Sequence, residues 1–247
     1  MMLFEGADII RLDTVDSTNN YAANLLKLST VSEGTVITAQ EQTQGRGQRG
    51  ASWSSSAGEN LLCSIVLYPR SIRPDEQFSL SQTVALAVHE MVEELTQVEA
   101  FIKWPNDIVV QDKKIAGILI ETSIAHNHLQ NAIVGVGLNL NQKVFEEPHA
   151  VSAGKITGKY YDVGDVAVRL QQLLSKHYAR LVYSKGAEIK TDYLHHLYNR
   201  DVSREYLYQG NKLNAIVRGV DDRGRLMLEL GDGSKLHCDL KEVQLIW

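Results

Sequence analysis

The sequence has little cysteine and no long apolar run, and each shortage excludes a class of protein. Its 247 residues include two cysteines, Cys63 and Cys238, which are too few for a disulfide scaffold or a cysteine-based zinc site and suit a reducing compartment. The longest apolar run, 115–120, is interrupted by Gly117 and falls far short of the ~20 residues of a membrane-spanning helix. The first residues lack the basic stretch and apolar core of a secretory signal. We therefore expect a cytoplasmic protein with no membrane partner.

Positive charge is also scarce. The chain has 25 lysine and arginine residues against 30 aspartate and glutamate residues, which gives a net charge of -5. An acidic chain argues against bulk binding to nucleic acid, although a local basic patch remains compatible with it. The hydrophobic fraction of 44% and the charged fraction of 22% are typical of a folded globular protein and exclude a largely disordered one.

The pattern of apolar residues predicts both strands and helices. Strands are expected at 9–15, 35–39, 61–67, 101–104, 107–111, 114–121 and 131–139. Helices are expected directly after the Asp16-Ser17-Thr18 cap and at 76–96, 165–183 and 187–198. The polar, glycine-rich segment 40–56 is predicted as a loop of a length that is usually functional. This mixture indicates an α+β fold.

The last fifty residues differ from the rest. From residue 199 onward the sequence shows short β-rich runs separated by turns at 209–211, 222–224 and 231–233, a pattern typical of a small barrel. Basic and acidic residues are equally frequent in this segment, so the negative charge of the chain comes from the part before it. The sequence therefore predicts two domains, 1–197 and 198–247.

One segment of the long loop carries alternating glycine and arginine. Gly45–Gly50 reads Gly-Arg-Gly-Gln-Arg-Gly and is followed by Trp53. Such a segment can turn backbone N–H groups and guanidinium groups toward an anion. It is not a P-loop, because no Gly-Lys-Ser/Thr follows at the required distance. Taken alone, it is equally well explained as a flexible surface loop with two solvated arginines.

Four further segments combine polar residues or glycines with predicted strand and helix ends. The Asn-Asp pair of 103–107 could hold a hard cation or a nucleotide, or form an ordinary turn. Lys114 begins an apolar strand and could lie over a buried site or in solvent. The glycines of 135–141 allow close approach of a ligand, or mark a bulge. The segment 16–19 alone is explained as a helix cap.

In their order and joint presence, these segments resemble the biotin protein ligases. The shared pattern is Asp-Ser-Thr-Asn, Gln-x-x-Gly-Arg-Gly-x-x-Gly-x-x-Trp, Lys-Trp-Pro-Asn-Asp, Lys-Ile-Ala-Gly-Ile-Leu-x-Glu and Gly-x-Gly-x-Asn, from about residue 13 to residue 141. The β-rich tail looks like the C-terminal SH3-like domain of that family. The resemblance implies a class II synthetase-like catalytic domain, with a mixed or antiparallel sheet flanked by helices, followed by a small SH3-like β-barrel.

The resemblance also implies a two-step reaction. Biotin and ATP, with Mg²⁺, would give biotinyl-5′-AMP and pyrophosphate, and the biotinyl group would then pass to a lysine of a biotin carboxyl carrier protein of a carboxylase. The chemistry of this reaction agrees with the composition, because it needs no cysteine or serine nucleophile. Attack of a carboxylate on a phosphate requires cations where charge develops, and the reactive anhydride must be covered from water.

Roles for single residues follow from the same resemblance. Lys114 and Arg46 are expected to be catalytic. The expected biotin contacts are Ser17, Thr18, Asn19, Gln42, Arg46, Gly47, Gln48, Lys114 and Gly117. The expected ATP or adenylate contacts are Arg49, Trp53, Lys103, Asn106, Asp107 and Asn139. Asp107 is also the candidate Mg²⁺ ligand.

The sequence departs from the family pattern at two loop positions. Gln48 stands where the family often has Arg. Ala51 stands where the family often has Arg or Asn. The loss of one charge-assisted contact at Gln48 is worth about 1–2 kcal/mol, so we expect weaker retention of the adenylate. Asp16 lies so near the start that no room exists for the N-terminal DNA-binding domain of bifunctional members. We therefore expect a short monofunctional type that does not bind DNA.

Three other functions stay open from the sequence. A lipoate or octanoate ligase would share the fold, although the segments 45–50 and 103–107 match biotin ligases more closely. A non-enzymatic regulator could bind biotin or nucleotide, but the presence of Lys114 and Asp107 disfavours it. Nucleic-acid binding is disfavoured by the net charge. A homodimer through an exposed strand edge is compatible with all of them.

Overall fold

The computed structural model describes residues 3–4, 6–184 and 187–246. It also describes their side chains, except those of Arg49, Ser184 and Ala187. Within these ranges the protein has two β-sheets and five α-helices. The strands of the larger sheet are β1 (Ile9–Val15), β2 (Val36–Gln42), β3 (Leu61–Leu67), β4 (Phe101–Lys103), β5 (Asp107–Val110), β6 (Lys113–Ala125) and β7 (His128–Leu138). The helices are α1 (Thr18–Leu28), α2 (Phe78–Thr96), α3 (Ala153–Thr157), α4 (Val163–Ser184) and α5 (Ala187–His195). Short 3-10 helices span Gln48–Gly50 and Pro74–Glu76.

The seven-stranded sheet is mixed. Its strand order is β1-β2-β3-β7-β6-β5-β4, and only the β1–β2 pair is parallel. Along β2 and β3, Val36 and Ile65 pack in the main core, whereas Ile37 and Val66 pack in a second cluster with α1. Because successive strand residues point to opposite faces, helices cover both faces of this sheet. The predicted α+β class is confirmed.

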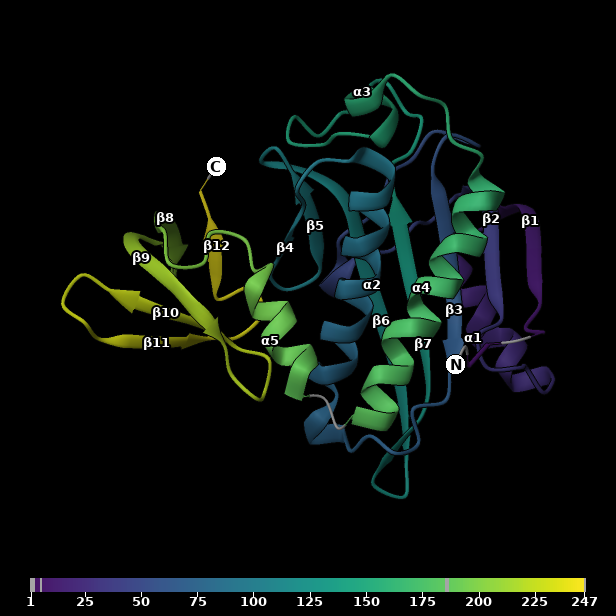
Figure 1. The fold of residues 1–247 in the computed structure, drawn as a ribbon, viewed down its shortest axis with the longest axis horizontal. Coiled ribbons are helices and arrows are strands. Elements are labelled where there is room, and N and C mark those ends of the chain that lie inside the picture. The colour runs from purple at the N-terminus through teal and green to yellow at the C-terminus, as the bar shows by residue number, and fades with distance from the viewer. Residues whose placement is uncertain (1–2, 5, 185–186, 247) are drawn as a thin grey trace.

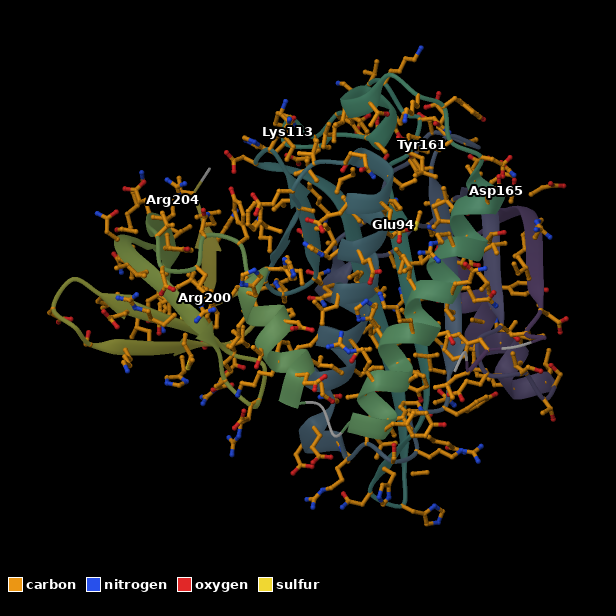
Figure 2. The ribbon with its side chains drawn as sticks, in the orientation of Figure 1. Glu94, Lys113, Tyr161, Asp165, Arg200 and Arg204 are labelled. Atoms are coloured by element: carbon orange, nitrogen blue, oxygen red, sulfur yellow. The ribbon has the colours of Figure 1, made fainter. Side chains whose placement is uncertain are left out.

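Helices α2 and α4 lie side by side across one face of the sheet (Figure 1). Tyr161, just before α4, donates its hydroxyl hydrogen bond to the carbonyl oxygen of Leu95 near the end of α2, at 2.8 Å (Figure 2). The carboxylate of Glu94, in α2, accepts hydrogen bonds from Nε and Nη2 of Arg169, in α4. These contacts fix the helical layer behind the sheet. Within the described ranges, no helix is long and apolar enough to cross a membrane.

The second sheet is antiparallel and follows α5. Its strands are β8 (Ser203–Tyr208), β9 (Asn211–Val220), β10 (Leu226–Leu230), β11 (Lys235–Cys238) and β12 (Val243–Leu245), in the order β11-β10-β9-β8-β12. It lies next to α5 and β4, at the end of the molecule opposite β1 (Figure 1). Apolar side chains such as Val217 and Leu226 belong to the same core cluster as those of α2 and α4.

Predicted boundaries are wrong by three residues or more in three places, and each has a physical reason. Strand β2 continues to Gln42, inside the predicted loop, because its pairing with β1 continues to that residue. The β6–β7 hairpin is longer than predicted, because His126 and Asn127 both adopt positive φ and form a tight turn. Helix α5 ends at His195, three residues early, because the next residues pair with β4 through Ile102.

Candidate functional site

A cavity of about 220 Å³ lies over the middle of the seven-stranded sheet. Its floor contains Gly117 of β6 and Gly137 of β7, which face each other across the ladder, and Gly135 one step further along. The indole of Trp53 lies against this floor, and a Cβ atom at Gly117 would stand 2.8 Å from the indole Cζ3. The missing side chains therefore leave the space that the indole and the cavity occupy.

The start of α1 supplies a polar wall. Ser17 is the N-cap residue but its side chain does not cap the helix, so its buried hydroxyl stays available to the cavity. The backbone N–H of Thr18 donates to Oε1 of Gln42 at 2.8 Å. Oγ of Ser64, which is fully buried, lies 2.6 Å from Oδ1 of Asn19 and 2.8 Å from Oγ1 of Thr18. A ligand here meets hydroxyl and amide groups that are already held in place.

The glycine and arginine segment after β2 folds into a small hairpin over the cavity. Trp53 N–H donates to Gly45 O at 2.9 Å, and Gly47 N–H donates to Ala51 O at 2.7 Å. A Cβ atom at Gly45 would overlap the carbonyl oxygen of Trp53, so the close approach of the two arms requires glycine there. Arg46, Gly47 and Gln48 line the cavity from this hairpin.

Lys114 and Asp107 form an ion pair at one end of the cavity. Nζ of Lys114 lies 2.7 Å from Oδ1 of Asp107, which is buried and has no hydrogen-bonded partner of good geometry. The same ammonium lies 5.4 Å from the ring centroid of Trp53. The backbone of Lys114 is held by hydrogen bonds to His149 and Val151. A register shift in the β5–β6 ladder, a feature common beside functional sites, lies next to Lys114.

A second cavity, of about 530 Å³, lies between the 103–107 segment and the second sheet. Gln48 and Asp107 line both cavities, so the two spaces meet at these side chains. Lys103 lines the second cavity, where burial lowers its pKa and Asp107 partly offsets that effect. Nε1 of Trp104 donates to the carbonyl oxygen of Gly224, at 2.9 Å. The C-terminal sheet thus contacts the segment that holds Asp107.

The first cavity brings together most of the residues singled out from the sequence. They are Ser17, Thr18, Asn19, Gln42, Arg46, Gly47, Gln48, Trp53, Asn106, Asp107, Lys114 and Gly117. Lys103 lines the second cavity instead. Asn139 is buried and is not among the described residues that line either cavity; its amide donates to Val151 O at 3.0 Å. The side chain of Arg49 lies outside the described residues.

Sequence reasoning missed three side chains that shape this site. Ser64 is a polar residue inside the otherwise apolar strand 61–67, and that interruption was the available signal. Glu121 ends the Lys-Ile-Ala-Gly motif, and no role was assigned to it. Cys63 lines the cavity, but burial raises the pKa of its thiol to about 12, so it is not a thiolate nucleophile at neutral pH.

The arrangement suits an anionic ligand with a polar, uncharged head group. Lys114 and Arg46 provide positive charge at the cavity, and the 17–19 wall provides hydrogen-bonding groups. A fixed ammonium beside the path of a reacting anion can stabilise charge that develops there.

Comparisons with known proteins agree with this geometry. A model of the Biotin/lipoate A/B protein ligase family matches residues 12–139. The Biotin--[acetyl-CoA-carboxylase] ligase of Mycobacterium tuberculosis is 31% identical over 90% of this chain and 84% of that protein. The Bifunctional ligase/repressor BirA of Bacillus subtilis is 28% identical over 93% of this chain and 72% of that protein. The structure of a biotin protein ligase from Aquifex aeolicus in complex with biotin and ATP superposes with a TM-score of 0.79 and 28% identity, covering 97% of this chain and 98% of that chain.

Proposed function

The chain belongs to the biotin/lipoate A/B protein ligase family, and from that premise we propose that it is a biotin protein ligase. It converts biotin and ATP to biotinyl-5′-AMP and pyrophosphate, and then transfers the biotinyl group to a lysine of a biotin carboxyl carrier protein. The observation that carries the proposal is a single cavity that holds the polar 17–19 wall, the Lys114–Asp107 pair and the glycine-rich hairpin.

The polar wall suits the head group of biotin. Its bicycle is mostly apolar and has one ureido edge with both donors and an acceptor. Ser17, Thr18 and Asn19 offer hydroxyl and amide groups of both kinds beside an apolar floor. In this proposal, these groups orient the bicycle so that the carboxylate tail points toward Lys114.

Lys114 is the residue proposed to act on the reacting atoms. In the first step, a biotin carboxylate oxygen attacks the α-phosphorus, and the bond to the oxygen that bridges to the β-phosphorus breaks, so pyrophosphate leaves with the electron pair. Both reactants are anions, and the ammonium of Lys114 neutralises their repulsion and the charge of the transition state. Arg46 and the hairpin cover the mixed anhydride against water.

The second step needs no further protein nucleophile. The unprotonated ε-amine of the carrier lysine attacks the acyl carbon, the acyl–oxygen bond breaks, AMP leaves with the electron pair, and the new amide nitrogen loses one proton. This chain then only has to hold the adenylate in place and let the carrier reach it. The 103–107 segment and the second cavity are the proposed side of approach for nucleotide and carrier.

The donor set at Asp107 fits a magnesium ion that is bound mainly through phosphates. No group of three or more His, Cys, Asp and Glu residues in the described ranges could hold a metal by itself. Mg²⁺ commonly uses one or two carboxylates together with substrate phosphates and water, and Asp107 offers a buried carboxylate oxygen that is ion-paired with Lys114. We propose that Asp107 holds the ion, which would offset negative charge on the phosphates.

A dimer is compatible with the sheet. Strand β1 pairs with β2 and with no other strand of the described chain, and β4 is covered by the segment that follows α5. We propose β1 as the edge through which two copies pair, and size-exclusion chromatography with light scattering tests it.

One assay tests the proposed function against its alternatives. The protein is incubated with ATP, Mg²⁺, an apo carrier domain and either biotin or lipoate, and the carrier is weighed by mass spectrometry. A mass gain with biotin supports the proposal, and a gain with lipoate alone supports the related ligase. An unchanged carrier, with biotin binding detected by calorimetry, supports a non-enzymatic regulator.

A further inference from the structure

Glu121 of β6 receives hydrogen bonds from two separate parts of the cavity. Its Oε2 accepts from Nδ2 of Asn19 at 2.8 Å, and its Oε1 accepts from Nη2 of Arg46 at 2.7 Å. Nη1 of Arg46 also donates to Oδ1 of Asn20, at 2.7 Å. One carboxylate thus joins the recognition wall at the start of α1 to the hairpin over the cavity.

The contact with Asn19 fixes the direction of its amide. A carboxylate only accepts hydrogen bonds, so the NH₂ group of Asn19 must face Glu121 and its Oδ1 must face Ser64. Ser64 then donates its hydroxyl proton to Oδ1 of Asn19, and its Oγ also lies 2.8 Å from Oγ1 of Thr18. The hydroxyl of Thr18 donates to Oε1 of Gln42, at 3.1 Å. The charge of Glu121 therefore orders a chain of donors that runs from Ser64 to Asn19, and Gln42 directs the hydroxyl of Thr18.

The contact with Arg46 is of a different kind. The two side chains are 43% and 35% exposed, so water and salt screen their attraction and the pair is easily exchanged. An arginine held in this way is placed at the cavity rim and can still turn to an anionic ligand. The carboxylate of Glu121 therefore holds the amide of Asn19 firmly, whereas its ion pair with Arg46 is weak and exchangeable.

We propose that Glu121 is a positioning residue for this site: it orients the Asn19–Ser64 hydrogen bond of the wall that receives the ligand head group and sets Arg46 of the hairpin over the same cavity. The inference rests on the proposed function where it concerns biotin, whereas the Glu121–Arg46 support does not depend on the identity of the ligand.

The first experiment uses limited trypsin digestion of the ligand-free protein. Trypsin cleaves after Arg46 only when this part of the hairpin leaves its place. Glu121→Gln keeps the shape and an acceptor but removes the charge, and we expect cleavage after Arg46 to be about two- to fivefold faster, with a smaller salt dependence than in the unaltered protein. The matched control is Glu99→Gln, which removes the same charge from an exposed side chain far along the sequence. Equal cleavage rates in Glu121→Gln and the control would overturn the support of Arg46.

The second experiment measures biotinyl-AMP formation. With Glu121→Gln, Nδ2 of Asn19 loses its charged acceptor and keeps the longer contact with the carbonyl oxygen of Leu119, at 3.4 Å. The amide is therefore held less firmly, so we expect KM for biotin to rise about fivefold or more, while kcat changes less than twofold because Lys114 and Asp107 are untouched. Ser64→Ala breaks the chain from its buried end, so it should raise KM for biotin but leave the trypsin cleavage rate unchanged. A merely structural Glu121 would lower the melting temperature and leave KM at its normal value.

The outcomes separate this inference from the proposed function. If the unaltered protein forms no biotinyl-AMP, the proposed function fails, and the trypsin comparison still decides the role of Glu121 toward Arg46. If the unaltered protein is active and both Glu121→Gln and Ser64→Ala keep a normal KM for biotin, the ordering of the wall by Glu121 is wrong.

Discussion

The ammonium of Lys114 and the carboxylate of Asp107 meet at 2.7 Å where the two cavities join. Lys114 thus stands beside one carboxylate before any ligand arrives. An incoming anion on the first cavity's side would share or take over the ammonium, and Asp107 would then be free to face the second cavity. The pair is therefore suited to a reaction between two anions that enter from different sides.

The first prediction concerns Lys114. Because Lys114→Ala removes the preorganised positive charge, we expect biotinyl-AMP formation to fall by about a hundredfold or more, with little change in melting temperature. Biotin-dependent exchange of pyrophosphate into ATP measures this step directly. Lys113→Ala removes the same charge from the exposed neighbouring residue (Figure 2) and should stay near full activity. Adenylation at a near-normal rate in Lys114→Ala would show that another group supplies the charge.

The second prediction concerns Gln48, which lines both cavities together with Asp107. Gln48→Arg introduces a charge-assisted partner for the adenylate, worth about 1–2 kcal/mol, so biotinyl-AMP should dissociate several-fold more slowly. Bystander proteins should be labelled less, which mass spectrometry of an added non-substrate protein measures. Gln44→Arg adds the same charge to an exposed position of the same loop and should change neither quantity. An unchanged dissociation rate in Gln48→Arg would mean that glutamine already satisfies the site.

Much of the fold could be predicted because it follows from local patterns. Alternation and apolar runs predicted the strands of the larger sheet, and the 3.6-residue period predicted α2 and α4. The missed ends of β2 and α5 depended on contacts outside the segment concerned. Helix α5 ends where the chain pairs with Ile102, and no local pattern in 187–198 encodes that partner.

The candidate site could be predicted only in part. The residues of the cavity were found because they lie in recognisable motifs, but their mutual contacts depend on the register of strands far apart in the sequence. Arg46 and Glu121, for example, are 75 residues apart, and their ion pair forms because the hairpin that follows β2 reaches a residue inside β6. Asn139 is a different case: its amide holds the carbonyl of Val151, a contact that its motif did not indicate, and its contact with the adenylate stays a prediction.

The third prediction concerns the contact between Trp104 and Gly224. Trp104→Phe keeps the aromatic packing and removes the hydrogen bond to the Gly224 carbonyl, at a cost of about 1 kcal/mol. Because Trp104 lies in the segment that lines the second cavity, we expect KM for ATP to rise several-fold more than KM for biotin. Steady-state kinetics of adenylation measure both. Tyr160→Phe, which also removes one polar group from an aromatic side chain, is the exposed control.

A truncation would test the same region less cleanly. A chain that ends before residue 198 should keep part of its biotin binding and lose most of its transfer activity. It would also uncover Phe78 of α2 and Leu194 of α5, which lie against Gly224 and Gly219, so loss of fold and loss of function would coincide. Equal KM changes for both substrates in Trp104→Phe would argue against a role for the C-terminal sheet in nucleotide binding.

The last prediction concerns Asp221, which holds the turn that presents Gly224 to Trp104. Its carboxylate accepts hydrogen bonds from the backbone N–H groups of Arg223 and Arg225, from Nε of Arg225 and from Nδ1 of His237. Burial alone would raise the pKa of Asp221, but the hydrogen bonds from His237 and Arg225 outweigh it and lower the pKa to about 2. A folded-state pKa below that of the unfolded chain means that the ionised carboxylate stabilises the fold.

This stabilisation is fully present above the unfolded-state pKa of about 3.8 and is lost as the pH falls toward 2. At neutral pH, Asp221→Asn should therefore lower the melting temperature by about 2–4 °C. The difference between the two proteins should persist down to about pH 4 and shrink below it, because Asp221 of the unfolded chain takes up a proton there while that of the folded protein stays ionised down to about pH 2. Asp13→Asn, at an exposed position of β1, should show no such pH-dependent difference. If the gap between Asp221→Asn and the unaltered protein stayed constant from pH 7 to about pH 2.5, its source would be lost hydrogen-bond geometry and not the charge of Asp221.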